Sequence, residues 1–441
     1  MDLIGLLRGA LGMIFLLALC YVLSNNKKHI NWKLVGAGII LQLSFAWGVM
    51  TPHLFWMDGN VIHDLFQWLA DRFVGLISIF HKGTEFVFGP AFASPAGPWG
   101  FVFAVQVLPT IIIFSALSAL LYYLGVLQKI CYGFAWVLSK SMKLSGAESM
   151  STASNIFLGQ TEAPLMIKPY LAAMGRSEIL LIMVGGMANT AGSVLSAYVQ
   201  MLGGSDQHLQ AFYALHMLTQ SIISAPAAIV VSKMLFPQTD DSHINRQLVV
   251  SKENIGSNAL DAISNGTTDG LKLAVNVAAM LIVFTALVWM VDALMMKIGG
   301  WTHLNDTILS LSDGRYQGLS LRFVFGYAFA PLAWMIGTPS HDMLAVGQLL
   351  GEKTMINEFF AYGTLADMKM KGLIAPESKS MVIATYALSG FANFASIGIQ
   401  IGGIGSLAPN QRTNLSTLGI KALIGGTIAC LMTADIAGML M

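Results

Sequence analysis

Apolar runs close to the thickness of a membrane alternate along the chain with short polar connections. One helical crossing of a bilayer needs roughly 20 predominantly apolar residues. The pattern therefore predicts an all-α polytopic membrane protein with eight transmembrane helices. The predicted spans are residues 9–24, 34–51, 101–125, 177–203, 211–236, 274–297, 381–405 and 417–440.

Two further segments are mixed or polar rather than apolar. Residues 61–90 interleave charged side chains with Phe, Trp and Leu at helical spacing, which is typical of a helix that lies in the membrane interface. Residues 237–272 are polar and predict the main solvent-exposed loop. The loop carries Asp240, Asp241, Arg246, Lys252 and Glu253.

Residues 148–174 and 340–370 each have room for two short helices with polar residues between them. The first segment is centred on Gly159-Gln-Thr-Glu-Ala-Pro164 and the second on Ile356-Asn-Glu-Phe-Phe360. Non-helical backbone at membrane depth survives only where protein packs around it or where it lines a wet cavity. We therefore expect two re-entrant hairpins whose tips reach the middle of the membrane.

Similar stretches follow the two hairpins, namely Gly186-Met-Ala-Asn-Thr-Ala-Gly-Ser193 and Gly390-Phe-Ala-Asn-Phe-Ala-Ser396. Three predicted spans separate the hairpins, so the hairpins would enter from opposite faces of the membrane. This is an inverted repeat with two broken helices, which is typical of alternating-access transporters. Chance is the alternative explanation for so short a match in a chain rich in Ala and Gly.

Composition supports a membrane protein and argues against other classes. Hydrophobic residues make up 55% of the 441 residues and charged residues 11%, against about 25% charged in soluble domains. A net charge of +1 argues against a nucleic-acid partner. The sequence has no nucleophile–base pair, phosphate-binding loop or metal-ligand cluster, so we expect neither an enzyme nor a cofactor. The isolated Cys20, Cys131 and Cys430 fit no metal-binding spacing.

Positive charges predict the orientation in the membrane. Lys and Arg follow the first, third and fifth predicted spans and flank the start of the eighth, so this side is expected to be cytoplasmic. The first span lacks a basic region before it and a cleavage site after it, and we interpret it as retained. Both termini would then lie outside. Asp292 and Asp435 fall near predicted outer ends, where we expect solvated carboxylates.

Glu162 and Glu358 lie at the centres of the predicted hairpins. A carboxylate in the middle of a membrane costs roughly 2.5–3.5 kcal/mol, so it usually faces a cavity and has a function. The alternative is a hairpin tip in water. Pro164 removes a backbone donor and disfavours helix before it. Gln160 and Thr161 add donors and acceptors, which suit a neutral hydrogen-bonding solute such as a heterocycle or a sugar.

Polar residues in the predicted broken helices are further candidates. Asn393 and Ser396 lie one helical turn apart on one face. Asn155, Asn189 and Thr190 offer oxygen atoms of the kind that bind sodium ions in broken helices. Contacts between neighbouring helices are the alternative role for all of these residues.

The sequence resembles the concentrative nucleoside transporters from about residue 100 to the C-terminus, and before that only in its pattern of spans. The matching motifs are Gly159-Gln-Thr-Glu-Ala-Pro-Leu165, Lys168-Pro-Tyr170, Gly192-Ser-Val194, Asn357-Glu-Phe359, Ala387-Leu-Ser-Gly-Phe-Ala-Asn-Phe394 and Ile397-Gly-Ile-Gln-Ile-Gly-Gly403. The resemblance implies a symporter that imports nucleosides with sodium ions across the inner membrane of the cell by elevator-like alternating access. It also implies a homotrimer in the lipid bilayer.

The resemblance further implies a scaffold and a mobile transport domain in each protomer. The chain would divide into residues 1–145, mainly scaffold; 146–236, the first half of the transport domain; 237–335, a loop and the sixth span of the scaffold; and 336–441, the second half of the transport domain. The residues implied for the nucleobase are Gln160, Thr161, Glu162 and Val194, and those for the ribose are Glu358, Phe391, Asn393 and Ser396. The groups implied for sodium are Asn155, the Leu158 carbonyl, Asn189 and the Thr190 carbonyl.

The position of Asn189 normally carries a Ser or Thr hydroxyl in that family. Proton coupling therefore stays open beside sodium coupling. A channel-like pore for small polar solutes, a receptor without transport and an intramembrane enzyme also stay open. Accumulation of solute against its gradient distinguishes a symporter from a channel.

Overall fold

The computed structural model describes residues 3–52, 59–94, 98–100, 102–239, 256–312 and 314–441. All regular secondary structure in these residues is helical, so the all-α prediction is confirmed. The helices in the first half of the chain are α1 (Leu3–Val22), η1 (Lys27–His29), α2 (Trp32–Met50), α3 (Val61–Phe88), α4 (Pro90–Ala93), α5 (Phe103–Gln106), α6 (Leu108–Tyr123), α7 (Val126–Met142), α8 (Gly146–Ser154), η2 (Ala163–Ile167), α9 (Lys168–Leu171), α10 (Arg176–Ala188), α11 (Gly192–Gly203) and α12 (Gln207–Leu235). Those in the second half are α13 (Ala259–Trp301), α14 (Leu304–Leu311), α15 (Leu321–Met335), α16 (Met343–Met355), α17 (Glu358–Met370), α18 (Lys379–Leu388), α19 (Phe394–Leu407), η3 (Pro409–Gln411) and α20 (Arg412–Leu440).

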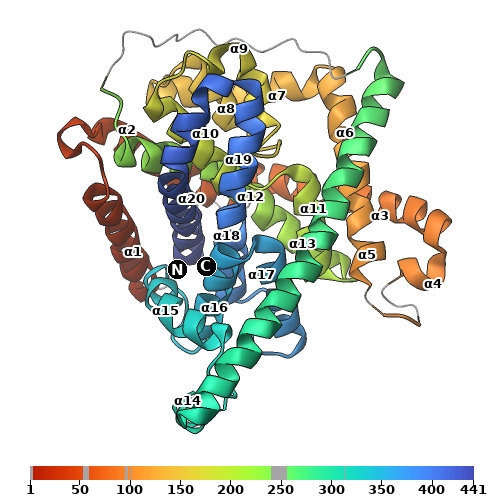
Figure 1. Ribbon diagram of the computed structural model, residues 1–441. Helices are drawn as coiled ribbons and strands as arrows, with labels where there is room; N and C mark the ends of the chain where they lie inside the picture. Colours follow the sequence, from red (N-terminus) through yellow and green to blue (C-terminus); the bar gives the residue numbers. More distant parts are fainter. Residues whose placement is uncertain (1–2, 53–58, 95–97, 101, 240–255, 313) are drawn as a thin grey trace.

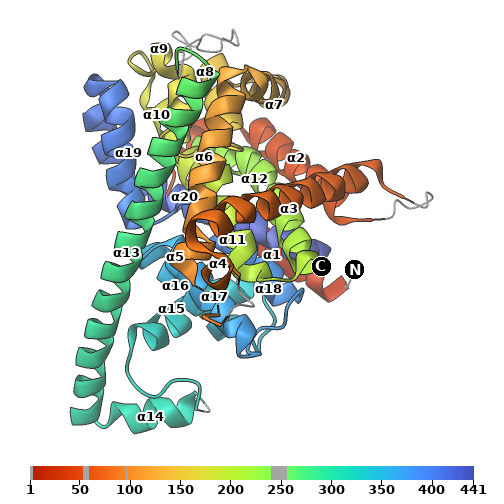
Figure 2. The ribbon, with the colours of Figure 1, turned by 90° about the vertical axis from the view of Figure 1, so that its right-hand side faces the viewer.

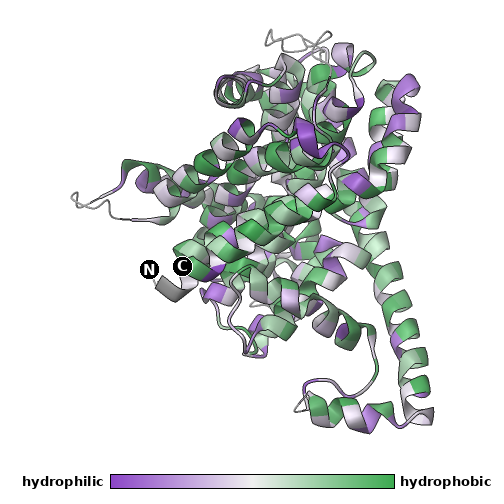
Figure 3. Cartoon of the chain, turned by 90° about the vertical axis from the view of Figure 1, so that its left-hand side faces the viewer, coloured by the Kyte–Doolittle hydropathy of each residue, from purple (hydrophilic) through white to green (hydrophobic). Residues whose placement is uncertain are grey.

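The core of the molecule is formed by α10, α11, α12 and α20, which are mostly buried. Helices α1, α2, α6 and α13 lie around them (Figure 1). These outer helices expose large apolar side chains, and Figure 3 shows that the long helix α13 consists mostly of hydrophobic residues. Seven stretches of the described residues are helical, long and apolar enough to cross a membrane. They correspond to seven of the predicted spans, whereas the predicted span 381–405 is divided between the shorter α18 and α19. Because this apolar exterior would be unstable in water, the fold is that of a multi-pass membrane protein.

Helix α13 is far longer than the span predicted at 274–297. Its 43 residues make a helix of about 64 Å, roughly twice the hydrocarbon thickness of a bilayer. Figure 1 shows α13 running along most of the molecule. The prediction of a loop is wrong from residue 259 onward, because these residues form the first turns of α13 on the cap provided by Asn258. The charged residues predicted for this loop, 240–253, lie outside the described residues.

Residues 61–88 form the single amphipathic helix that their pattern predicts. Phe66, Ala70, Val74 and Ile77 recur every three or four residues and are buried against α12, α6 and α2, while the opposite face is exposed. Figure 2 shows α3 crossing the direction of α6 and α13. Its place in the membrane interface stays a prediction.

The two longest helices that were not expected from the sequence are α7 and α15. Helix α7 carries lysines among its apolar residues, so its pattern does not resemble a span. Helix α15 is apolar but has only 15 residues and contains Pro331, which is short of a crossing. It packs along α16, where a Cβ on Gly347 would lie 2.7 Å from the Ala330 nitrogen. Such close approach is possible only because that residue is a glycine.

Asp435 is fully buried, so the expectation of a solvated carboxylate is wrong. Asp435 lies on α20, and α1 packs against this helix. Its Oδ1 lies 2.8 Å from the point that a Cβ on Gly12 of α1 would occupy. Neither carboxylate oxygen of Asp435 has a hydrogen-bond partner. Asp292 is half-buried and accepts a hydrogen bond from the Leu321 nitrogen at 2.7 Å. The local sequence does not show that other helices cover Asp292 and Asp435, so it could not predict their burial.

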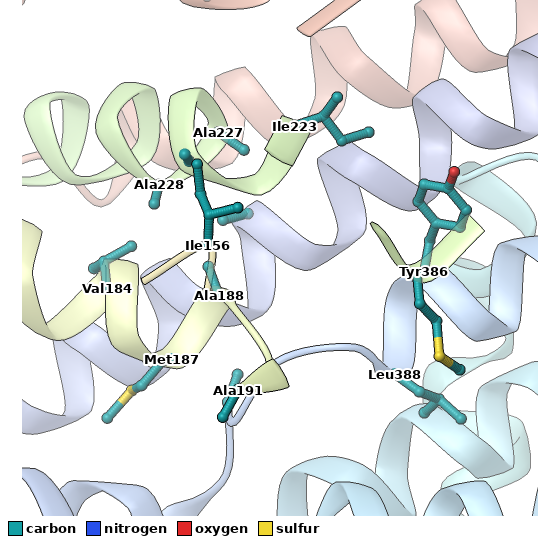
Figure 4. Packing of buried hydrophobic residues seen from close by; sticks show 14 of the residues in the cluster. Ile156, Val184, Met187, Ala188, Ala191, Ile223, Ala227, Ala228, Tyr386 and Leu388 are labelled. Carbon is teal, nitrogen blue, oxygen red and sulfur yellow. The ribbon is translucent and has the colours of Figure 1, made fainter. Parts of the chain in front are cut away.

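The predicted spans 177–203 and 381–405 are both broken helices. Helix α10 ends at Ala188 and α11 begins at Gly192, while α18 ends at Leu388 and α19 begins at Phe394. Figure 4 shows Ala188 and Ala191 on the two sides of the first break, with Leu388 at the second. Each break leaves the carbonyl end of one half-helix and the amide end of the next without partners in the helix.

The motif that suggested the repeat does not align residue by residue. Asn189 follows the last residue of α10, whereas Asn393 precedes the first residue of α19. The Asn393 side chain caps α19 by accepting a hydrogen bond from the Ser396 nitrogen at 2.9 Å. In both halves a hairpin is followed by a broken helix. The two matching asparagines, however, lie at opposite ends of their breaks.

The two breaks contact each other at the centre of the bundle. The Gly390 nitrogen donates to Oγ1 of Thr190 at 2.8 Å. Cys430 of α20 donates its Sγ to the Ser389 carbonyl at 2.9 Å. Gly390 has a φ of +102°, and a Cβ there would lie 2.7 Å from the Ala188 carbonyl oxygen. A side chain at this position would push the two breaks apart.

We predict that Gly390→Ala destabilises the protein by roughly 1–3 kcal/mol, because the new methyl group collides with backbone and φ is positive. Thermal unfolding of the purified protein in detergent measures the effect. Gly398→Ala on α19 is the matched control, since no atom lies within 4 Å of its Cβ position. Equal unfolding midpoints for the two variants would contradict the close contact between the breaks.

Candidate functional site

Both predicted hairpin segments are helix–turn–helix units, although their second arms differ. In the second, α16 and α17 are joined by only Ile356 and Asn357. In the first, α8 is followed by a turn and then by the short η2 and α9 instead of a continuous helix. Pro164 lies in the first turn of η2, as expected from its missing donor. The turn between α8 and η2 contains Gln160, Thr161 and Glu162.

A buried polar network holds the base of the first hairpin against the bundle. Glu148, in the first turn of α8, forms a capping box with Ser145. The same carboxylate is paired with Lys233 of α12, and both side chains are buried. Lys233 also donates to Oγ of Ser177 at 3.1 Å, and Ser145 donates to Oε1 of Glu178 at 3.0 Å. A buried ion pair of this kind costs several kcal/mol to break, so the hairpin is fixed to α10 and α12.

All eight residues predicted to bind substrate surround one pocket of about 290 Å³. The first hairpin, the second hairpin, both broken helices and α13 contribute to its walls. The lining residues are Gly159, Gln160, Thr161, Glu162, Ala191, Val194, Leu273, Asn276, Val277, Met280, Leu281, Asn357, Glu358, Phe359, Phe391, Asn393, Ala395, Ser396 and Ile399. Apolar walls with a few convergent polar groups are typical of a site for a small organic molecule.

Hydrogen bonds hold the polar groups of this pocket in place. Asn393 donates its Nδ2 to Oε2 of Glu358 at 2.7 Å, which joins the second break to the second hairpin. Gln160 donates its Nε2 to Oγ of Ser396 at 3.2 Å, which joins the first hairpin to α19. Glu162 accepts from the Gly159 nitrogen at 3.2 Å within its own turn. The site is thus assembled across both halves of the chain.

Three polar residues of the site were missed by the sequence interpretation. Asn276 of α13 and Asn357 line the pocket directly. Gln400 is fully buried and donates its Nε2 to Oε1 of Gln160 at 3.1 Å and to the Met183 carbonyl at 3.0 Å. Its spacing of four residues from Ser396 on α19 places both on one helix face. This spacing could have identified Gln400 as a candidate residue of the site.

A second cavity of about 300 Å³ adjoins the first, and Glu162 and Ala191 line both. Its walls come from the first hairpin, the start of α11, α6 and the first part of α13. Ser115, Ser118 and Asp269 give it polar groups. Glu162 is exposed rather than packed in the core, because its side chain faces these two cavities. A carboxylate facing a cavity can stay solvated within an apolar bundle.

The four groups predicted for a cation lie where the first hairpin meets the first break. The Gly192 nitrogen donates to the Phe157 carbonyl at 3.1 Å, which joins the two segments next to Leu158 and Thr190. Asn155 is buried, and both its amide oxygen and its amide nitrogen lack a hydrogen-bond partner. Buried polar groups without partners are rare. The unpaired oxygen of Asn155 fits a bound cation.

Asn189 has a different environment from Asn155. Its Oδ1 accepts a hydrogen bond from Ser224 of α12, and its Nδ2 has no partner. Ser221 on the same helix also has a buried hydroxyl without a partner. The sequence interpretation did not include α12 in this region. The described residues contain no group of three or more His, Cys, Asp or Glu side chains that could hold a metal ion.

Families of known proteins match most of the chain. Residues 11–91, 104–205 and 216–438 match the families described as "Na+ dependent nucleoside transporter N-terminus", "Nucleoside recognition" and "Na+ dependent nucleoside transporter C-terminus". An "Uncharacterized transporter" of Haemophilus influenzae is 38% identical over 99% of this chain and 98% of its own length. "Sodium/nucleoside cotransporter 1" of Rattus norvegicus is 36% identical over 97% of this chain and 63% of its own length.

Solved structures are similar over the whole chain. The structure of CNTnw in an inward-facing substrate-bound state has a TM-score of 0.85 and 34% identity, covering 99% of this chain and 98% of that one. A CNTnw variant in an outward-facing state has a TM-score of 0.87 and 33% identity, with the same coverage. The fold of this chain is therefore similar to that of known transporters.

Proposed function

The chain belongs to the concentrative nucleoside transporter family, and from this premise we propose that it imports nucleosides by symport with sodium ions across the inner membrane. The observation that carries the proposal is the pocket of about 290 Å³, in which polar side chains from both halves of the chain converge between apolar walls. A nucleoside is a neutral solute with many donors and acceptors. It matches amides, hydroxyls and carboxylates better than an anion would.

The two sides of the pocket divide between base and ribose in this proposal. Gln160, Thr161 and Glu162 of the first hairpin face the nucleobase, and Val194 packs against it. The ribose hydroxyls bind the paired side chains of Glu358 and Asn393 together with Ser396, with Phe391 beside them. The hydrogen bond between Asn393 and Glu358, 2.7 Å long, supports a shared role for that pair. Carboxylates accept hydrogen bonds from hydroxyl groups strongly.

Sodium binds between the first hairpin and the first break, at the Asn155 and Asn189 side chains and the carbonyls of Leu158 and Thr190. The unpaired amide of Asn155 supports this assignment. The same hairpin carries the groups proposed to bind the base. A cation that orders the hairpin therefore raises the affinity for nucleoside, and reciprocity requires that nucleoside raises the affinity for the cation.

In the membrane, we propose eight crossings and two re-entrant hairpins, with both termini outside. The transport domain comprises residues 146–236 and 336–441, and it moves as a near-rigid body past a scaffold comprising residues 1–145 and 237–335. The scaffold forms a homotrimer. The exposed apolar surface of the scaffold helix α13, which includes Ile282 and Trp289, supports contact with lipid or with other protomers.

Proton coupling is the second candidate function. The observation that favours it is the hydrogen bond from Ser224 to Oδ1 of Asn189, because it occupies one of the two lone pairs that this oxygen could offer to a cation. Uptake of uridine by vesicles containing the purified protein separates the two candidates. We expect accumulation above equilibrium when a sodium gradient is imposed and none from a pH gradient alone. Uptake that responds only to the pH gradient would reject sodium coupling, and uptake that never exceeds equilibrium would indicate a channel.

We predict that Glu162→Gln and Glu358→Gln each lower uridine uptake at least about tenfold while leaving expression unchanged. Replacing a carboxylate by an amide weakens its hydrogen bonds to the ligand and puts a donor where an acceptor is needed. Glu85→Gln is the matched control, since Glu85 is exposed on α3 and lies outside the pocket. Wild-type uptake by both pocket variants would show that these carboxylates do not bind substrate.

We predict that Asn189→Ser lowers the sodium concentration needed for half-maximal uptake. A serine hydroxyl offers an oxygen without the amide NH₂ group, which repels a cation. Asn155→Ala should abolish the response to sodium, because it removes the side chain whose oxygen is unpaired. Sodium titrations of uridine uptake measure both effects. An unchanged sodium dependence in both variants would place the cation elsewhere.

A further inference from the structure

A lysine brings a buried ammonium group to the second helix break. Lys353 lies in the last turn of α16 and is only 2% exposed. Its Nζ donates to the Ala387 carbonyl at 2.8 Å and to the Ser389 carbonyl at 3.4 Å. These carbonyls belong to the C-terminal end of α18, where carbonyl groups lack partners within the helix. The ammonium thus binds the negative end of the half-helix dipole.

The first break also has a half-helix, α10, and a hairpin beside it, but no buried lysine among the described residues binds the end of this half-helix. The first hairpin brings Asn155 to the last turn of α10, with its Nδ2 3.1 Å from the Cβ position of Gly185. The Ala188 carbonyl at the end of α10 accepts from the neutral amide of Gln220 at 3.2 Å. The only other buried lysine among the described residues, Lys233, is paired with Glu148 at the base of the hairpin.

Each hairpin therefore delivers one polar side chain to the end of the half-helix that precedes a break. In the first half this side chain is an amide with an unpaired oxygen. In the second half it is an ammonium group, which can only donate hydrogen bonds. Carbonyl groups at the broken end of a helix are the ligands that would attract a metal ion. At the second break, two of these carbonyls are bound to Lys353.

We propose that Lys353 is a tethered cation that takes the place of a metal ion at the second break. The ammonium orders the break that carries Phe391 and Asn393 into the pocket, as sodium orders the first hairpin. The ordered break also positions Asn393, which donates a hydrogen bond to the carboxylate of Glu358. Lys353 is a positioning residue for the ribose side of the pocket, and it restricts ion coupling to the first break. This inference rests on the proposed function.

Binding of uridine to the purified protein tests the proposal through its sodium dependence. In the wild type we expect a single sodium ion per protomer at saturating uridine, measured with radioactive sodium. In Lys353→Ala we expect uridine affinity at limiting sodium to fall at least about tenfold. At high sodium the affinity of this variant for uridine should recover, and it should depend more steeply on the sodium concentration, because a second sodium ion binds at the second break. Lys353→Arg keeps the charge and the wild-type behaviour.

Lys369→Ala is the matched control. Lys369 is partly buried, and its Nζ donates to the Leu202 carbonyl near the end of α11, away from both breaks. We expect this variant to lose stability, while the number of sodium ions bound per protomer and the sodium dependence of uridine affinity stay unchanged. A merely structural role for Lys353 would give the same result for Lys353→Ala and would overturn the proposal. Two sodium ions bound per wild-type protomer would also overturn it, and this readout needs no variant.

A third measurement separates this inference from the proposed function. Thermal unfolding of Lys353→Ala in ethylammonium chloride needs neither transport nor nucleoside. We expect saturable stabilisation of this variant by ethylammonium, with no such effect on the wild type or Lys369→Ala. Sodium should stabilise all three proteins through the first break, and Lys353→Ala more than the other two because it binds a second ion. Absence of the stabilisation by ethylammonium overturns the tethered cation even when sodium-driven uptake is intact. Its presence in a protein without sodium-driven uptake supports the tethered cation and rejects the symport proposal alone.

Discussion

Broken backbone inside an apolar bundle must find its hydrogen-bond partners within the protein, because no lipid chain can supply them. Two helices in the described residues are broken, and their free ends find partners in each other, in the hairpins and in α12 and α20. Thr190 accepts from Gly390, and the Phe157 carbonyl accepts from Gly192. These contacts place both breaks and the first hairpin within a few ångströms of one another. The remaining elements of the core pack around this centre.

The same breaks create the pocket. A helix that stops in the middle of the bundle leaves space beside its end, and the next residues direct their side chains into that space. Asn393 shows both effects, since its oxygen caps α19 while its amide group holds Glu358. Glu358 itself is the first residue of α17, where the positive end of the helix dipole stabilises a carboxylate. The residues that stabilise the break therefore also line the pocket.

The ends of α10 and α18 at the two breaks present the same electrostatic problem and meet it with different groups. The carbonyl end of a half-helix carries partial negative charge and has to be neutralised or solvated. At α18 the carbonyl end is neutralised by Lys353, a side chain of the adjacent hairpin. At α10 the adjacent hairpin supplies an amide with free capacity. The two breaks therefore differ in charge, since one holds a buried ammonium group and the other a neutral amide without a partner.

Apolar runs and hairpin centres were enough to predict the helical class and most helix positions, and with the family motifs they predicted eight of the residues that line the pocket. These features are local, since the thickness of a membrane fixes the length of an apolar run and a carboxylate within it is costly wherever the chain folds. Sequence reasoning failed where the outcome depends on distant partners. The burial of Asp435 by α1, the use of Gln400 to hold Gln160, the extension of α13 along α6 and the pairing of Lys353 with α18 all join positions far apart in the chain. Only tertiary packing decides such contacts, because each is set by which surface faces another after the bundle has assembled.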